Sequence, residues 1–548
     1  MGSAYTSYHA MLEWERKTPD KVFLHQPVDG VVKTFTWGES AETARRFANA
    51  LLAMGLNRGD KVAILAKNCA EWFIADCAMM MAGVISVPIY PTAEAKTIRY
   101  VLEHCEARAI IIGKLDNWQE PESALPGSII TIGMPYQTVD CQYNWADLID
   151  STQPLTAFSE PDSRDIMSIL YTSGSTGNPK GVCLSYGSYE YACKTCCDLL
   201  DYLEGDRTLS YLPLAHITER AVLEGPAIFS GVEVYFTDRL DTFQDDLRRS
   251  RATLFISVPR LWVKFQAGVH AQISPVKLRA LLALPIIGKI IAGKVRETLG
   301  LKHARLVGSG SAPISPLTLK WYSRLGINIS EGWGMTETCG LSCGNNPFRK
   351  ERIGTIGVPI PGTEMKLSEQ GEILLRSPAL FTEYYKEPEL TAAAFTEDGF
   401  LRTGDKGEWD DKLQAYRITG RVKDIFKSAK GKYVTPVPIE SRLSVNPNFE
   451  QICVMGSGLP APVAVVVLSP SAKTLPRERV EESLVDTLNS VNEQLESHER
   501  LGAIFVARDE WTIENELLTP TLKLKRDRLE EKYQALISRP ADSTIVWE

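Results

Sequence analysis

One segment of eleven residues, Tyr171-Thr-Ser-Gly-Ser-Thr-Gly-Asn-Pro-Lys-Gly181, combines Ser and Thr hydroxyls with glycines and a lysine. Gly174 and Gly177 let the backbone bring its N–H groups close to an anion. The hydroxyl groups add donors, and Lys180 adds a positive charge. The segment is therefore typical of a polyphosphate-binding loop and predicts a nucleotide-using enzyme. Its predicted phosphate contacts are Thr172, Ser173, Gly174, Ser175, Thr176 and Lys180.

The spacing in this segment differs from that of a P-loop. A P-loop needs Gly-x-x-x-x-Gly-Lys-Ser/Thr running directly into a helix. Here Pro179 separates the second glycine from Lys180, and the flanking apolar runs 166–171 and 182–184 read as strands. We expect a strand-loop-strand phosphate site. A Ser/Gly-rich surface linker is the alternative, but linkers seldom lie between two buried strands.

Two further motifs could bind the rest of a nucleotide. Gly308-Ser-Gly-Ser-Ala-Pro313 and Glu331-Gly-Trp-Gly-Met-Thr-Glu337 have glycines that permit close approach to a flat base, and Trp333 offers a face for stacking. Asp405 follows a glycine turn, where its carboxylate could accept hydrogen bonds from ribose hydroxyls. An Asx-turn is the structural alternative for Asp405.

The last motif, Leu518-Thr-Pro-Thr-Leu-Lys-Leu-Lys-Arg526, is basic and lies near the C-terminus. Negative charge builds up on an α-phosphate when a carboxylate attacks it, and a mobile lysine can neutralise that charge. Lys523 and Lys525 are both candidates for this lysine. A solvated basic run is the alternative interpretation.

These motifs occur in one order from about Tyr8 to Arg528, and together they resemble the acyl-adenylate-forming superfamily. That superfamily contains acyl-CoA synthetases, luciferases and nonribosomal-peptide adenylation domains. The amino-acid sequence of Thr519–Arg526 is most similar to that of long-chain fatty acyl-CoA synthetases. The resemblance implies that Thr336 contacts the α-phosphate, that Glu337 holds Mg²⁺ and that Asp405 holds the ribose. The implied nucleotide contacts also include Gly310, Ser311, Ala312, Gly332, Trp333 and Arg421.

The resemblance also assigns residues to a domain movement. It implies that Lys523 is the catalytic lysine, that Lys423 is a hinge and that the turn at Gly431 lines the CoA tunnel. Leu522 stands where the commoner form of the motif has glycine. The identity of the catalytic lysine therefore stays open between Lys523 and Lys525.

Two residues could serve the acyl substrate. His216, in Tyr211-Leu-Pro-Leu-Ala-His-Ile-Thr-Glu-Arg220, matches a position beside the acyl carboxylate in relatives, but a lone histidine can equally be a hydrogen-bonded core residue. Trp262, in a Val-Pro-Arg-Leu-Trp run, could wall an acyl channel. Ordinary aromatic packing is its alternative role.

The elements that position these residues alternate between helix and strand. Between Gly38 and Pro91 the pattern predicts a helix ending near Met54, a strand at 61–65, a helix over 69–82 and a strand at 84–89. Such alternation predicts an α/β fold with doubly wound mixed sheets. We expect a large N-terminal domain over 1–420, a hinge at 421–423 and a small mobile α+β domain over 424–548.

Length, charge and cysteine content narrow the number of domains, the kind of partner and the compartment to be expected. A chain of 548 residues is too long for one core. Its net charge of -8 argues against nucleic acid as a partner. Eleven cysteines without framework spacing, and the absence of an export signal, predict a cytoplasmic protein with reduced thiols. A zinc site at Cys193, Cys196 and Cys197 is the weaker interpretation of that cluster, whose role stays open.

Residues 276–296 are apolar and basic, but charge and Pro285 interrupt them too often for a bilayer span. They could form an interfacial helix on an anionic membrane, giving peripheral contact at its inner face, or two ordinary helices covering the sheet. The oligomeric state stays open, with a homodimer as one option.

The resemblance implies a ligase with ATP, Mg²⁺ and CoA as cofactors and co-substrates. It would convert a medium- to long-chain fatty acid into acyl-AMP and pyrophosphate, and then into acyl-CoA and AMP. The alternatives are another adenylate-forming enzyme, acting on a different acid or loading a carrier-protein thiol, and a non-catalytic binding protein.

Overall fold

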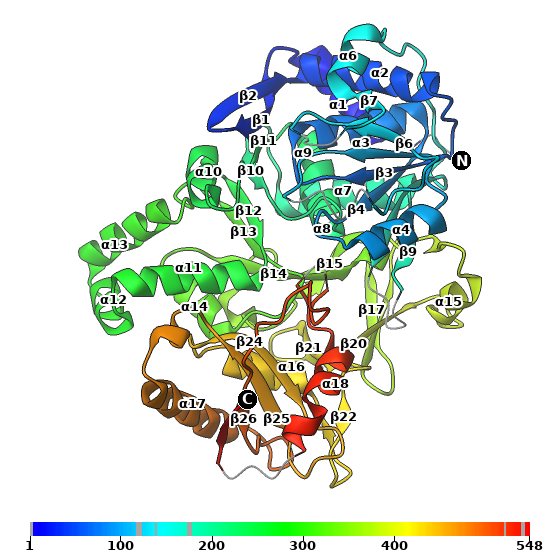
Figure 1. The fold of residues 1–548 in the computed structure, drawn as a ribbon. Helices are drawn as coiled ribbons and strands as arrows, with labels where there is room; N and C mark the ends of the chain where they lie inside the picture. Colours follow the sequence, from blue (N-terminus) through cyan, green and yellow to red (C-terminus); the bar gives the residue numbers. More distant parts are fainter. Residues whose placement is uncertain (1–3, 117–122, 137–139, 173–177, 520–521, 539–542) are drawn as a thin grey trace.

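The computed structural model describes residues 4–116, 123–136, 140–172, 178–519, 522–538 and 543–548. The predicted phosphate contacts Ser173, Gly174, Ser175 and Thr176 lie outside this range. Within it, the chain forms two large mixed sheets, a smaller antiparallel sheet and a C-terminal α+β region (Figure 1). The predicted fold class is confirmed.

The first large sheet carries the loop between Thr172 and Lys180. Its strand order is β19-β9-β8-β4-β3-β5-β6-β7. From β8 to β7 neighbouring strands are parallel, whereas β8–β9 and β9–β19 are antiparallel. The strands are β3 (Lys61–Leu65), β4 (Ile85–Ile89), β5 (Ala109–Ile112), β6 (Ile130–Gly133), β7 (Tyr143–Asn144), β8 (Ile166–Thr172), β9 (Lys180–Ser185) and β19 (Glu383–Tyr384). Helices in this part of the chain are α1 (Ser7–Lys17), α2 (Trp37–Ala53), α3 (Ala70–Ala82), α4 (Ala95–His104) and α6 (Trp145–Ser151).

The second large sheet carries the predicted nucleotide motifs at 308–313 and 331–337. Its order is β16-β15-β14-β13-β12-β10-β11-β1-β2. The strands are β1 (Val22–Val28), β2 (Val31–Thr36), β10 (Arg207–Ser210), β11 (Glu233–Phe236), β12 (Leu254–Ser257), β13 (Leu306–Ser309), β14 (Ile329–Met335), β15 (Gly340–Gly344) and β16 (Val358–Pro359). The helices between them are α7 (Tyr186–Leu200), α8 (Ile217–Glu219), a π-helical turn η1 (Arg220–Glu224), α9 (Gly225–Ser230), α10 (Phe243–Ser250), α11 (Pro259–Gln272), α12 (Pro275–Leu282), α13 (Pro285–Thr298) and α14 (Pro316–Arg324).

An antiparallel sheet and the C-terminal region complete the chain. The sheet has the order β17-β18-β20-β21, and β24-β25-β26-β27 form the sheet of the C-terminal region, beside a β22–β23 hairpin. Short 3₁₀ turns are η2 (Thr336–Thr338), η3 (Lys350–Arg352) and η4 (Ala472–Thr474). The remaining elements are β17 (Glu364–Leu367), β18 (Glu372–Arg376), α15 (Pro388–Ala393), β20 (Leu401–Asp410), β21 (Ala415–Arg421), β22 (Phe426–Lys427), β23 (Tyr433–Val434), α16 (Pro436–Leu443), β24 (Phe449–Met455), β25 (Val463–Leu468), α17 (Arg477–Asn492), β26 (Ile504–Val506), α18 (Arg526–Ile537) and β27 (Ile545–Trp547).

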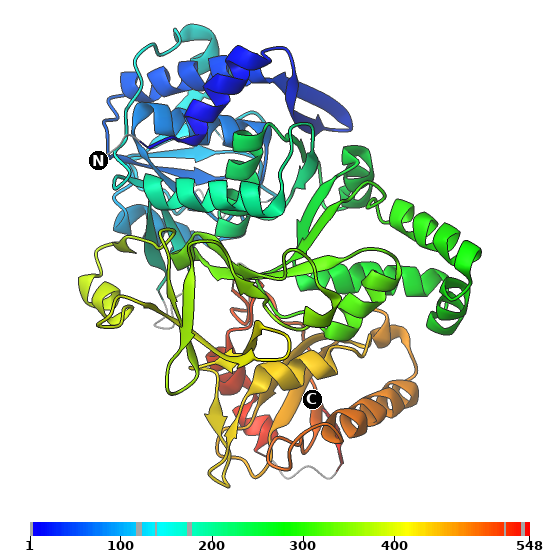
Figure 2. The same ribbon diagram turned by 180° about the vertical axis from the view of Figure 1, so that it is seen from behind.

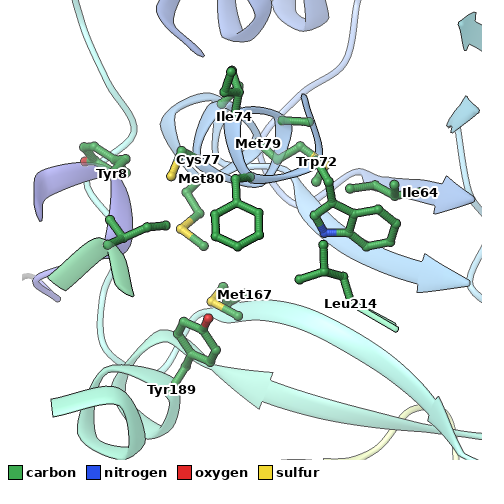
Figure 3. Close-up of a cluster of buried hydrophobic side chains, with 14 of the residues drawn as sticks. Tyr8, Ile64, Trp72, Ile74, Cys77, Met79, Met80, Met167, Tyr189 and Leu214 are labelled. Atoms are coloured by element: carbon green, nitrogen blue, oxygen red, sulfur yellow. The ribbon is translucent and has the colours of Figure 1, made fainter. Parts of the chain in front are cut away.

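Helix α3 forms the centre of the main core, because all of its residues are buried. A helix that is apolar on every side must lie inside the protein. Figure 3 shows Met80 of α3 on the side that faces Met167 of β8 and Tyr189 of α7, and Trp72 of α3 next to Leu214. This packing fixes β8, and with it one end of the predicted phosphate loop.

The C-terminal region packs beneath the second sheet and the antiparallel sheet (Figures 1 and 2). Arg260 of α11 forms an ion pair with Glu450 of β24 across this boundary. The segment before α18, in red in Figure 1, extends from the C-terminal region up to β14 and β15. Within the described residues, no helix is both long and apolar enough to cross a bilayer.

Candidate active site

The two ends of the predicted phosphate loop are paired strands. Thr172 of β8 lies opposite Lys180 of β9 in the antiparallel ladder. Lys180 Nζ donates to the Tyr384 hydroxyl at 2.6 Å and lies 3.0 Å from Glu337 Oε1. This contact joins the first sheet to the second, because Glu337 belongs to η2 at the end of β14.

Tyr384 completes this cluster, and the sequence analysis did not predict it. Its hydroxyl donates to Glu337 Oε1 at 2.8 Å. Burial, and then the carboxylate of Glu337, raise the pKa of Tyr384. The phenol therefore stays protonated and keeps donating. Tyr384 lies on a strand of two residues, β19, which has too few residues to show a periodic pattern in the sequence.

The glycine motifs of β13 and β14 bring two backbones together. A Cβ on Gly310 would lie 3.1 Å from the Gly332 carbonyl oxygen, and one on Gly334 would lie 1.5 Å from the Gly340 carbonyl oxygen. Only glycine fits the second position. Ser311 has a φ of 68°, a conformation that costs energy for a non-glycine residue and is often found at functional sites. Ala312, next to it, is exposed.

Asp405 lies in a buried position between two donors. The Trp333 indole N–H donates to its Oδ2 at 2.9 Å, and Arg421 Nε lies 3.2 Å from its Oδ1. Asp405 and Arg421 face each other in the β20–β21 ladder. Burial raises the pKa of Asp405, and the charge of Arg421 and the Trp333 hydrogen bond oppose that shift. Trp333, predicted as a stacking surface, is thus also a partner of the carboxylate.

The C-terminal segment brings Lys523 to the same place. Desolvation and the charge of Arg421 lower the pKa of Lys523, while Asp405 and Glu337 oppose that shift. Two hydrogen bonds join Thr519 to Lys523: the Thr519 backbone N–H donates to the Lys523 carbonyl at 2.8 Å, and the Thr519 hydroxyl accepts from the Lys523 N–H at 3.1 Å. The positive charges of Lys523 and Arg421 therefore face the two carboxylates in one site.

Two further features fix the position of this segment. Arg526 donates to Asp424 at 3.0 Å and to Glu440 at 2.6 Å. These two bonds hold the start of α18 against the rest of the C-terminal region. Leu522 has a φ of 59°. This left-handed conformation suits glycine, the residue of the commoner motif. The backbone at this position thus has a conformation that glycine favours, although the residue is leucine.

His216 lies at the start of α8, next to the site. Its Nδ1 accepts from the Thr218 backbone N–H at 3.2 Å, so the ring caps the helix as a neutral acceptor. Burial and the nearby charge of Lys523 lower the pKa of His216 to about 3. The Thr218 hydroxyl lies 3.5 Å from that of Ser311. His216 therefore has a structural role and also faces the Lys523 side of the site.

Three predicted residues lie apart from this cluster. Lys423 lies in the turn between β21 and β22. Gly431, with a φ of 74°, lies in the exposed turn after β22, at the end of the C-terminal region away from β14 and β15 (Figures 1 and 2). Trp262 is fully buried and packs edge-on against Phe255 and Tyr322. Their roles as hinge, tunnel and channel residues stay predictions.

The fold is that of a mixed α/β protein, and its candidate site lies where the C-terminal segment meets residues carried by the large sheets. The chain belongs to the AMP-binding enzyme family: the family model matches residues 11–385, and the model of the AMP-binding enzyme C-terminal domain matches residues 423–541.

Curated relatives match nearly the whole chain. A long-chain-fatty-acid–CoA ligase of Mycobacterium bovis is 30% identical over 95% of this chain and 95% of its own length. The peroxisomal long chain acyl-CoA synthetase 7 of Arabidopsis thaliana is 30% identical over 93% of this chain and 82% of its own.

Solved structures have the same fold. An anthranilate CoA ligase, solved with anthranoyl-AMP, superposes with a TM-score of 0.79 at 23% identity and covers 98% of this chain and 99% of its own. The adenylation domain of a carboxylate reductase from Mycobacterium chelonae has a TM-score of 0.80 at 24% identity, covering 97% and 90%. At this identity the likeness extends to the fold alone.

Proposed function

We propose that this protein is an ATP-dependent ligase that joins a medium- to long-chain fatty acid to CoA. The observation that carries the proposal is the convergence of Lys523 with Asp405, Glu337 and Arg421, which come from distant parts of the chain. The proposal that the acid has a medium to long chain is supported by the sequence of Thr519–Arg526 and by the names of the curated relatives.

In the first half-reaction, a carboxylate oxygen of the acid attacks the α-phosphorus of ATP. A bond forms between them, the bond to the β-phosphate oxygen breaks, and pyrophosphate leaves. Lys523 and Lys180 offset the negative charge that develops, and Thr336 donates to the α-phosphate. Asp405 holds the ribose hydroxyls and Trp333 orients Asp405. His216, neutral at physiological pH, positions the acid.

The carboxylate of Glu337 is suited to bind magnesium. Mg²⁺ is commonly bound by one or two carboxylates together with substrate phosphates. Among the described residues, no group of three or more His, Cys, Asp or Glu side chains is arranged to hold a metal. Glu337 is buried beside Lys180, where the triphosphate would lie. The bound ion would supply charge neutralisation on the phosphates.

In the second half-reaction, the C-terminal region, residues 424–548, rotates about the hinge at 421–423. This movement withdraws Lys523 and brings the Gly431 turn to the site. The CoA sulfur then attacks the acyl carbon, the thiol loses its proton, and AMP leaves. The segment before α18 reaches β14 and β15, whereas the turn after β22 lies at the opposite end of the C-terminal region, and this separation supports a two-state mechanism (Figure 1).

The test follows pyrophosphate release and acyl-CoA formation across straight-chain acids of increasing length, with and without CoA. The proposal expects fatty-acid-dependent pyrophosphate exchange without CoA and thioester formation with it. Exchange without any CoA-dependent consumption of acyl-AMP would instead favour a different acceptor, such as a carrier-protein thiol. An absence of exchange with every acid would contradict the ligase assignment.

A further inference from the structure

An exposed apolar surface lies at the far edge of the large region, on α12 and α13. We define this surface, residues 275–296, as the α12–α13 tip. Val276 is 80% exposed, Ile286 76% and Ile290 63%. Leu284 and Ile287 are also exposed. Figures 1 and 2 show the two helices projecting from the body of the protein, beyond α11.

One side of the tip is used for packing, and Leu282, Ile291 and Val295 lie partly buried there. Leu278 and Ala292 are buried in the cluster that contains Trp262, and they anchor the two helices to the large region. Ile286 and Ile290 are one helical turn apart, so they share one face of α13. Contiguous exposed apolar side chains mark interaction sites, whereas single ones are ordinary. The predicted alternative, two helices that merely cover the sheet, does not account for this outward face.

The charge around the tip is opposite to that of the whole chain. Residues 259–296 contain seven Lys and Arg and no Asp or Glu, although the protein has a net charge of -8. Lys277, Arg279, Lys289 and Lys294 are all exposed. The next acidic residue, Glu297, pairs with Lys302 at 2.8 Å. An apolar face bordered by lysines is complementary to an anionic lipid surface.

We propose that the α12–α13 tip inserts its apolar side chains into the headgroup region of an anionic lipid bilayer. Helix α13 has 14 residues, a length of about 21 Å, so it is too short to span the roughly 30 Å hydrocarbon core and would lie along the surface. Ile286, Ile287 and Ile290 enter the boundary between headgroups and acyl chains. The four lysine and arginine side chains contact lipid phosphates.

This contact would bring the proposed activity to the place where fatty acids partition. It rests on the proposed function, because a ligase for a hydrophobic acid gains access to its substrate from the bilayer. Helix α11, which carries Trp262, leads directly into the tip and shares its apolar cluster. The tip is therefore packed against the helix that carries Trp262.

The direct test measures sedimentation of the full chain with vesicles, in the absence of nucleotide. One set is phosphatidylcholine and the other an equal mixture of phosphatidylcholine and phosphatidylglycerol. We expect binding to the anionic vesicles that weakens as salt rises, since salt screens the lysine–phosphate attraction. Equal binding to both sets, or binding to neither, would overturn the proposal.

Paired variants locate the surface. Replacing Ile286 and Ile290 together by Glu should abolish vesicle binding, while Leu240→Glu, at a site 88% exposed elsewhere, should not. Lys289→Ala and Lys294→Ala should each weaken binding roughly fivefold. Lys412→Ala, on the exposed β20–β21 turn, is the matched charge control. Unchanged binding in the Ile286/Ile290 variant, or a wild-type dimer that this variant dissociates, would contradict lipid docking.

A second measurement separates this proposal from the function itself. Acyl-CoA formation is compared for one fatty acid supplied in anionic vesicles and the same acid supplied as a cyclodextrin complex. The Ile286/Ile290 variant should lose rate only with vesicles. Loss of rate with both forms would show that the tip affects catalysis instead of docking. Vesicle binding without any acyl-AMP formation would refute the proposed function alone.

Discussion

The hydrogen bond between Trp333 and Asp405 permits a sharp test of the nucleotide site. Trp333→Phe keeps an aromatic face for stacking but removes the N–H that donates to Oδ2 at 2.9 Å. A hydrogen bond to a charged group contributes about 1.5–3 kcal/mol. Because Arg421 still contacts the other oxygen, we take the lower end, which is about tenfold in affinity. The KM for ATP should therefore rise about tenfold.

The assay is ATP–pyrophosphate exchange with a saturating fatty acid. Trp511→Phe is the matched control, because that buried indole donates to Tyr533 at 3.0 Å, in the C-terminal region. The control should lower the melting temperature and leave the KM for ATP unchanged. An unchanged KM for ATP in Trp333→Phe would refute the role given to this pair.

Trp333→Phe should also shift the pH dependence of kcat/KM for ATP in a defined direction. The Trp333 hydrogen bond lowers the pKa of Asp405, so its loss raises that pKa. The ionised carboxylate accepts the ribose hydroxyls, and a higher pKa means that it is protonated at a higher pH. The acid limb of kcat/KM for ATP should therefore shift to higher pH in Trp333→Phe.

Variants at three other positions test the parts around the site. Leu522→Gly should retain adenylation because its φ of 59° suits glycine, whereas Leu522→Val should reduce it; equal activities would show that this turn conformation is unimportant. Arg526→Ala leaves two carboxylates without their partner and should destabilise the C-terminal region by about 3–5 kcal/mol in denaturant unfolding, unlike the exposed Arg528→Ala. His216→Asn should keep the cap on α8 and the melting temperature, whereas His216→Ala loses about 1 kcal/mol. If His216 also positions the acid, His216→Asn should still raise the KM for the fatty acid, and an unchanged KM would leave it a cap alone.

Much of the local structure could be predicted because buried strands leave a strong apolar pattern. The strand at 61–65 matches β3, and the helix expected over 69–82 matches α3 within one residue. The helix expected to end near Met54 matches α2, which ends at Ala53. Mixed sheets in the large region were predicted, but the order of their strands and the separate antiparallel sheet were not, since strand order depends on contacts between distant residues.

The candidate site shows the same limit. Motifs identified Lys180, Glu337, Asp405 and Lys523 separately, because each lies among glycines or charges that stand out in sequence. Their convergence, and the contribution of Tyr384, depend on pairing between β9 and β19 and on the place of the C-terminal segment. The glycine-like backbone of Leu522 was also hidden, because residue type alone favours an ordinary conformation there.

The measurement that tests the central claim most directly is the effect of Lys523→Ala on the two half-reactions, with Lys525→Ala as the matched control. Loss of a charge that stabilises the developing negative charge should slow acyl-AMP formation by about 10²- to 10³-fold. Thioester formation from supplied acyl-AMP should remain near the wild-type rate, and Lys525→Ala should affect neither step strongly. Equal losses in both half-reactions, or a larger effect from Lys525→Ala, would contradict the account.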